Sequence, residues 1–162
     1  MTMTVREAVV ADHPALARLG TQAFAAFGDY RGSMSRWLTN PGIATLVAEE
    51  AGEPLGFAML ALLQEPGGVH GNVLAVCVEP DRRRGGLGAT LLDAALDRLG
   101  AERERFGMKR IVADVAEDNA PALALFTAAG FVDEGLSGGR YPSGQRVRRL
   151  VKPLESSTIP PC

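Results

Sequence analysis

Cysteine and histidine are scarce in this chain of 162 residues, with two of each. Cys77 lies in an apolar run and Cys162 is the final residue, so we expect two separate thiols in a reducing compartment rather than a disulfide. The few cysteines and histidines are too scattered to form a zinc site, and we expect no metal.

Long apolar runs and a large excess of one charge are also missing. No stretch approaches the roughly 20 apolar residues that a membrane span needs. The first residues do not form the basic and then apolar pattern of a signal peptide. The formal net charge of −2 argues against a general nucleic-acid binder, which is usually basic overall. We therefore expect a cytoplasmic protein that binds neither nucleic acid nor membrane.

What remains is the composition of one globular domain. With 46% hydrophobic and 22% charged residues, the chain has enough apolar material for one core. We expect this domain to span residues 1–154. The Ser/Pro-containing segment 155–162 is expected to be a disordered tail.

Hydrophobic periodicity predicts the order of the elements. Two apolar runs flank a polar turn and predict an antiparallel hairpin, and a later buried strand precedes a long amphipathic helix. Segments 64–70 and 134–146 are expected to be loops. The expected elements are strand 4–10, a helix capped by Asp12, helix 34–38, strands 43–48, 55–63 and 73–78, helix 87–106, strand 111–115, helix 121–129, and strands 131–133 and 147–151. This order predicts a single α/β domain with a mixed sheet.

The most informative segment joins strand 73–78 to the long helix, and it reads Pro80-Asp-Arg-Arg-Arg-Gly-Gly-Leu-Gly88. The first amides of a helix have no partner within the helix, and the helix dipole makes that end positive. Glycine lets the backbone approach a ligand closely, and the arginines add formal charge. These features predict a site for a phosphate or pyrophosphate group. The alternative is a plain tight turn with solvated arginines.

Two common nucleotide-binding patterns do not fit this turn. The Walker pattern is absent, which disfavours a nucleoside triphosphatase. The dinucleotide pattern G-x-G-x-x-G also fails, because Leu91 stands where the third glycine should follow Gly86 and Gly88.

The turn resembles instead the [Q/R]-x-x-G-x-[G/A] signature of the GNAT superfamily of N-acetyltransferases, which here reads Arg83-Arg-Gly-Gly-Leu-Gly88. The usual lead-in is present as Val78-Glu-Pro80. A second family pattern, Asn-x-x-Ala-x-x-Leu-Tyr and then Gly-Phe, is similar to the segment from Asn119 to Phe126 followed by Gly130-Phe131. The element order matches the family over nearly the whole chain.

This resemblance implies a mixed, mostly antiparallel sheet with flanking helices, in which two splayed central strands hold acetyl-coenzyme A. It implies an enzyme that moves the acetyl group to a primary amine of a small molecule or peptide, by direct attack in a ternary complex. It is also compatible with a homodimer. The matching cofactor positions are Val76, Cys77, Val78, Arg83, Arg84, Gly85, Gly86, Leu87, Gly88, Ala89, Asn119 and Phe126.

By this resemblance, strand backbone from 76–78 binds the pantetheine arm, and one of its amides polarises the thioester carbonyl. Amides of the turn bind the pyrophosphate. Asn119 contacts the cofactor arm, although a plain helix cap is the alternative. Phe126 lies near the sulfur, although core packing explains it equally well.

Two departures from the family pattern leave the catalytic groups open. Phe126 replaces a tyrosine whose hydroxyl can protonate the leaving thiolate, and Asn72 stands where some members have a glutamate base. The candidates that remain are His70, whose alternative is a solvated loop histidine, and Tyr141. Proximity of amine and thioester is a further source of rate.

The main competing interpretation is a non-catalytic acyl-CoA binder or sensor. Another acyl donor and a nucleotide-binding module also stay open.

The acceptor site of this fold lies between the first two helices and the last hairpin. We expect Phe27 and Tyr30 to line it and Asp29 to face the ammonium group, with core packing as the alternative for the aromatic residues. Peptide N-termini, lysines, polyamines, aminoglycosides and amino acids all remain open as acceptors.

Overall fold

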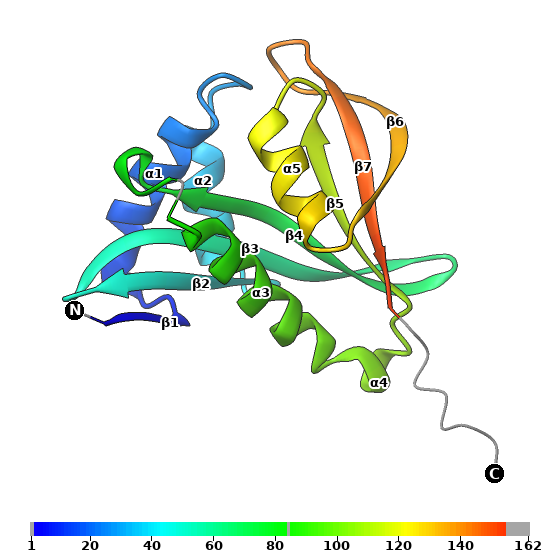
Figure 1. The fold of residues 1–162 in the computed structure, drawn as a ribbon, viewed down its shortest axis with the longest axis horizontal. Coiled ribbons are helices and arrows are strands. Elements are labelled where there is room, and N and C mark those ends of the chain that lie inside the picture. Colours follow the sequence, from blue (N-terminus) through cyan, green and yellow to red (C-terminus); the bar gives the residue numbers. More distant parts are fainter. Residues whose placement is uncertain (1, 84, 155–162) are drawn as a thin grey trace.

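The structure is a computed structural model that describes residues 2–83 and 85–154. Its centre is one seven-stranded sheet with the order β1-β2-β3-β4-β5-β7-β6 (Figure 1). All neighbouring strands are antiparallel except β4 and β5, which are parallel. The strands are β1 Met3–Glu7, β2 Ile43–Glu50, β3 Glu53–Glu65, β4 Gly68–Val78, β5 Arg110–Ala116, β6 Val132–Arg140 and β7 Arg146–Pro153. The predicted mixed, mostly antiparallel sheet is confirmed.

Helices cover both faces of the sheet (Figure 1). The α-helices are α1 His13–Ala23, α2 Arg31–Thr39, α3 Leu87–Gly100, α4 Arg103–Phe106 and α5 Ala120–Ala128, with 3-10 turns at Val10–Asp12 and Pro80–Arg82. On the α3 and α5 face, a core forms around Leu91 and Ile111. On the α1 and α2 face, a second core forms around Leu16, Met34 and Phe57. Burial of each large apolar side chain contributes about 1.5–3 kcal/mol, so both faces stabilise the sheet.

The two central strands part from each other soon after they meet. β4 and β5 pair only at Gly71 with Ile111 and at Asn72 with Val112. Just beyond, β4 carries one extra residue, Leu74, against β3. Such a bulge bends the strand and increases its twist. The rest of β4 therefore turns away from β5, which confirms the expected splayed pair.

The two segments expected to be loops are largely strand, so those predictions are wrong. Val69 pairs with Gln64 and His70 with Leu63, so the β3–β4 hairpin continues almost to its Pro66-Gly67 turn. Likewise, β6 continues to Arg140 through irregular register against β7. Ladder hydrogen bonds join backbone groups, and polar or glycine-rich residues can therefore extend a strand whose partner is already in place.

The first strand is shorter than predicted, and Asp12 does not cap α1 with its side chain. Its carboxylate instead accepts the Val9 N–H at 2.8 Å and two bonds from Arg6 at 2.7 and 2.9 Å. The Arg6 guanidinium lowers the pKa of Asp12 to about 2. This partly buried pair ties the end of β1 to the start of α1.

The long helix predicted over 87–106 is also divided, because α3 ends at Gly100 and α4 is a separate short turn. Within the described ranges, no helix is both long and apolar enough to cross a membrane. The segment 155–162, expected to be a disordered tail, lies outside the described residues, as does Arg84.

Candidate active site

A cleft lies where β4 and β5 separate. It encloses a cavity of about 60 Å³, which holds a group of only a few heavy atoms. Strands β4 and β5, helix α5 and two connecting loops all contribute to its wall. The lining residues are Phe24, Phe27, Val73, Leu74, Ala75, Val76, Asp114, Val115, Ala116, Asn119, Ala122, Phe126 and Tyr141.

The β4 wall presents backbone to the cleft. Beyond Asn72 this strand no longer pairs with β5, so its groups on that side face the opening. A ligand with amide groups can bind such an edge as an added strand. Val76 lines the cleft, whereas the Cys77 side chain is buried in the core beneath α1 and α2. Burial raises the pKa of the Cys77 thiol to about 12, so this cysteine is no nucleophile at neutral pH.

The basic, glycine-rich turn leads from β4 into α3. Gly86 is the N-cap of α3 and has a left-handed φ of +79°, which glycine adopts without strain. The first helical bond of this end runs from the Thr90 N–H to the Gly86 carbonyl at 3.0 Å, so the amides of residues 87–89 have no carbonyl partner within the helix. Arg83 is exposed beside them, and its Nε donates to the Val78 carbonyl at 3.4 Å. Among the residues that the structure describes, the turn thus presents these helix-start amides and a positive charge, which together suit an anion.

This turn lies next to the cleft. A Cβ placed on Gly88 would lie 3.7 Å from Leu125 of α5 and 3.9 Å from Val78 of β4. The N-terminus of α3 is therefore between the two elements that border the cleft, and one elongated ligand can contact both the turn and the cavity.

Helix α5 supplies both residues that the sequence places beside the cofactor. The Asn119 Oδ1 accepts the Ala122 N–H at 3.3 Å, so this side chain caps α5 and lines the cleft as well. Phe126 is buried and packs edge-to-face on Phe131, with ring centroids 5.0 Å apart. It is therefore both a core residue and part of the cleft wall.

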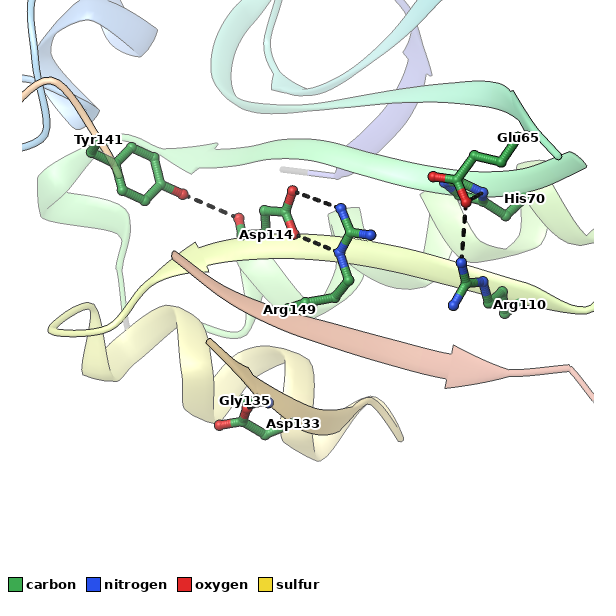
Figure 2. A network of polar contacts seen from close by, with 8 residues as sticks. All are labelled: Glu65, His70, Arg110, Asp114, Asp133, Gly135, Tyr141 and Arg149. Atoms are coloured by element: carbon green, nitrogen blue, oxygen red, sulfur yellow. Dashed lines mark hydrogen bonds and ion pairs between the residues drawn. The ribbon is translucent and has the colours of Figure 1, made fainter. Parts of the chain in front are cut away.

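Asp114 of β5 is a cleft residue that the sequence analysis missed. Among the described lining residues it alone carries a carboxylate. That carboxylate accepts from Arg149 of β7, at 3.2 Å from Nε and 3.5 Å from Nη2 (Figure 2). The signal was a single charge inside the otherwise apolar strand Ile111-Val-Ala-Asp-Val-Ala116. A charged side chain is unfavourable in a strand that is covered on both faces, so this aspartate indicates that the strand borders an opening at that position.

Tyr141 lies at the same end of the cleft as Asp114 (Figure 2). Its hydroxyl donates to the Asp114 backbone carbonyl at 3.3 Å. Burial raises the pKa of Tyr141 to about 12, so the phenol keeps its proton at neutral pH. A raised pKa makes Tyr141 a dependable hydrogen-bond donor but a weaker acid.

The loop between β6 and β7 is fastened to the loop between α1 and α2. The Ser143 N–H donates to the Phe27 carbonyl at 3.1 Å, and Gln145 Nε2 donates to the Ala26 carbonyl at 3.0 Å. The Phe27 and Tyr141 rings pack with centroids 5.5 Å apart. Of the three residues predicted to contact the acceptor, Phe27 is thus placed in the cleft wall.

The other two predicted acceptor residues do not line the cleft. Asp29 is on the surface, where Arg31 donates to its carboxylate at 2.7 and 3.0 Å. The Tyr30 ring packs between Phe24 and Trp37. Neither side chain faces the cavity.

His70 is not a loop histidine, so that interpretation is wrong. It lies in β4 with 4% of its surface exposed, and its Nδ1 is 3.5 Å from Glu65 Oε2 (Figure 2). Burial is the main cause that lowers the pKa of His70. The side chain belongs to a separate hollow that Arg110 also lines, and it is not part of the cleft wall.

Both the sequence and the fold of this chain are similar to those of known proteins. The sequence pattern of the acetyltransferase (GNAT) family matches residues 9–131. The chain is 33% identical over 123 residues to the mycothiol acetyltransferase of Clavibacter michiganensis, which covers 76% of this chain and 36% of that protein. The chain thus spans about a third of the length of that relative.

Solved structures show the same fold over nearly the whole chain. The ribosomal-protein-S18-alanine N-acetyltransferase of Escherichia coli superposes with a TM-score of 0.73 at 19% identity, covering 98% of this chain and 99% of that one. A Salmonella typhimurium protein solved with its cofactor acetyl-CoA superposes with a TM-score of 0.72 at 22% identity, covering 99% of each chain.

Proposed function

The chain belongs to the acetyltransferase (GNAT) family, and on that premise we propose that it transfers an acetyl group from acetyl-coenzyme A to a primary amine. The observation that carries the proposal is the arrangement of three features around one cleft. A helix N-terminus beside a basic turn, a strand edge not paired with β5 and a carboxylate follow one another along it.

The acyl donor, acetyl-coenzyme A, would be held by backbone groups more than by side chains. The amides of residues 87–89 and the exposed Arg83 suit the pyrophosphate. The free edge of β4 suits the amides of the pantetheine arm, and an N–H of that edge would polarise the thioester carbonyl. Asn119 and Phe126 would flank the end of the arm, since both line the cavity. Arg84 matches the same family signature and belongs to this proposal on the sequence alone.

Asp114 is the proton acceptor in this proposal. The amine nitrogen attacks the thioester carbon, a C–N bond forms, the C–S bond breaks, and coenzyme A leaves as a thiolate. The Asp114 carboxylate takes the proton that the amine loses, because it is the carboxylate of the cavity wall. Tyr141 donates a hydrogen bond at this end of the cleft, and its raised pKa makes it a positioning group more than an acid.

Replacement of the family's tyrosine by Phe126 does not prevent this reaction. A thiol with an ordinary pKa of about 8.5 is a good leaving group and can depart as thiolate without a protein acid. Proximity of the two bound reactants supplies a large part of the rate.

The acceptor of a relative named for ribosomal protein S18 is an alanine amine, and others are named for small molecules, so both classes are candidates here.

Release of free coenzyme A tests the proposal. Purified protein with acetyl-CoA is expected to release thiol when amines from a panel are added, at a rate saturable in both substrates. Intersecting double-reciprocal lines are expected, because attack is direct in a ternary complex. Parallel lines would contradict direct attack. Tight acetyl-CoA binding without thiol release from any amine would favour a non-catalytic acyl-CoA binder instead.

A further inference from the structure

We propose that the acceptor carries a carboxylate within a few bonds of its amine, and that Arg149 binds this carboxylate. The inference rests on the proposed acetyl transfer and narrows its acceptor to amino acids and closely related amines. Three observations on the described residues and one consequence of the proposed reaction carry it.

The first is the accessibility of the pair that Arg149 forms. Helices α1 and α2 pack on β2, β3 and β4, whereas charged side chains occupy the continuation of the same face on β5 and β7 (Figure 2). The side chains of Arg149 and Asp114 keep 35% and 40% of their surface exposed. A ligand can therefore reach both from solvent.

The second is the geometry of the guanidinium. The described contacts of Arg149 use one N–H on Nε and one on Nη2, and the second of these, at 3.5 Å, is at the limit of a hydrogen bond. An arginine has five N–H groups in a planar fork that suits a carboxylate. A half-exposed ion pair of this kind exchanges readily with a ligand, because it contributes little on its own.

The third is the change of charge during the reaction. When Asp114 accepts the amine proton, its carboxylate becomes neutral, and Arg149 then loses its counter-ion. A carboxylate on the acceptor restores that counter-ion at the moment of transfer. Since Asp114 and Arg149 are direct cross-strand neighbours, the amine and the carboxylate must be close together on the acceptor.

The fourth is the distance to Arg110, the other arginine that β5 and β7 carry on this face. Arg110 precedes Asp114 by four residues on β5, which is roughly 13 Å along an extended strand. It also pairs with Glu65 at 3.3 Å, beside the buried His70. Glu65 neutralises the charge of Arg110, and both residues are out of reach of a small acceptor in the cleft. Arg149 is therefore the cation that contacts the acceptor.

Pairs of amino acids and their amides test this inference, with alanine and alaninamide as the first pair. The kcat/KM of each is measured with saturating acetyl-CoA and corrected to the concentration of free amine. We expect wild-type protein to favour acids over amides by at least about 30-fold, and Arg149→Gln to bring that ratio close to one. The matched control is Arg148→Gln, since Arg148 points to the other face of β7 with the same 35% exposure and pairs with Asp133 at 3.2 Å. It should keep the wild-type ratio.

The ratio of kcat/KM for an acid to kcat/KM for its amide distinguishes recognition of the carboxylate from a general effect of Arg149 on Asp114. A loss of activity that is equal for acids and amides in Arg149→Gln would show that Arg149 only positions Asp114, and would overturn the inference. Wild-type protein that acetylates amides as well as acids would also overturn it while leaving the proposed acetyl transfer intact. Failure to acetylate any amine would overturn both.

Discussion

Replacing Asp114 with asparagine is expected to lower kcat by about 100- to 1000-fold, with little change in the affinity for acetyl-CoA. Asparagine keeps the size of the side chain but cannot accept the amine proton, and general-base catalysis typically contributes a factor of this order. The amide also keeps an oxygen for Arg149, so the fold should remain intact. The measurement is kcat across a range of pH with the best amine of the panel, together with a melting curve.

The chain offers a close control for this variant. Asp133 of β6 also pairs with an arginine of β7, at 3.2 Å, and its side chain is 41% exposed against 40% for Asp114. It lies apart from the Tyr141 end of the cleft (Figure 2). Asp133→Asn is expected to keep wild-type kcat. An Asp114→Asn enzyme within about threefold of wild type would remove this carboxylate from the mechanism.

Placing a negative charge in the basic turn is expected to abolish most of the cofactor affinity. In Gly86→Asp the carboxylate would stand beside the amides of residues 87–89, where the pyrophosphate binds, and would repel it. We expect the dissociation constant of acetyl-CoA, measured by calorimetry, to rise by at least about 100-fold. A Cβ at Gly86 would meet no atom within 4 Å, so the variant should not clash.

Backbone strain needs its own control, because Gly86 has a left-handed φ of +79° that an aspartate adopts only at some cost. Gly107 has a φ of +61°, follows α4 and also has open space around its Cβ position. Gly107→Asp therefore matches the strain and the charge but lies away from the turn. It should bind acetyl-CoA like wild type. Equal affinity in a folded Gly86→Asp protein would show that the anion site is elsewhere.

The turn and the order of elements could be predicted from sequence because their causes are local. Glycines and arginines next to a helix start define an anion site within about ten residues, and hydrophobic periodicity marks each element. The family signature from Arg83 to Gly88 then gave the splayed pair of strands, which no local rule predicts. The structure agrees and adds the cause, since the extra residue Leu74 bends β4 away from β5.

The sequence does not reveal the role of Asp114 and predicts the wrong setting for His70, because the surroundings of both residues depend on strand register. The partner of Asp114, Arg149, is 35 residues away, and only the β5–β7 pairing brings the two together. His70 was assigned to a loop because Pro66 and Gly67 lie nearby. The extension of the β3–β4 hairpin instead buries it beside Glu65. Cross-strand pairing of this kind cannot be read from residue spacing.

Amide hydrogen exchange with and without acetyl-CoA tests the central claim most directly. The claim is that one cofactor molecule lies between β4 and β5, with its pyrophosphate on the start of α3. It predicts slower exchange on binding in segments 73–78 and 85–89 and at Asn119, with little change in β1 and α2. Binding that leaves 73–78 and 85–89 unprotected, or no binding by the folded protein, would contradict it.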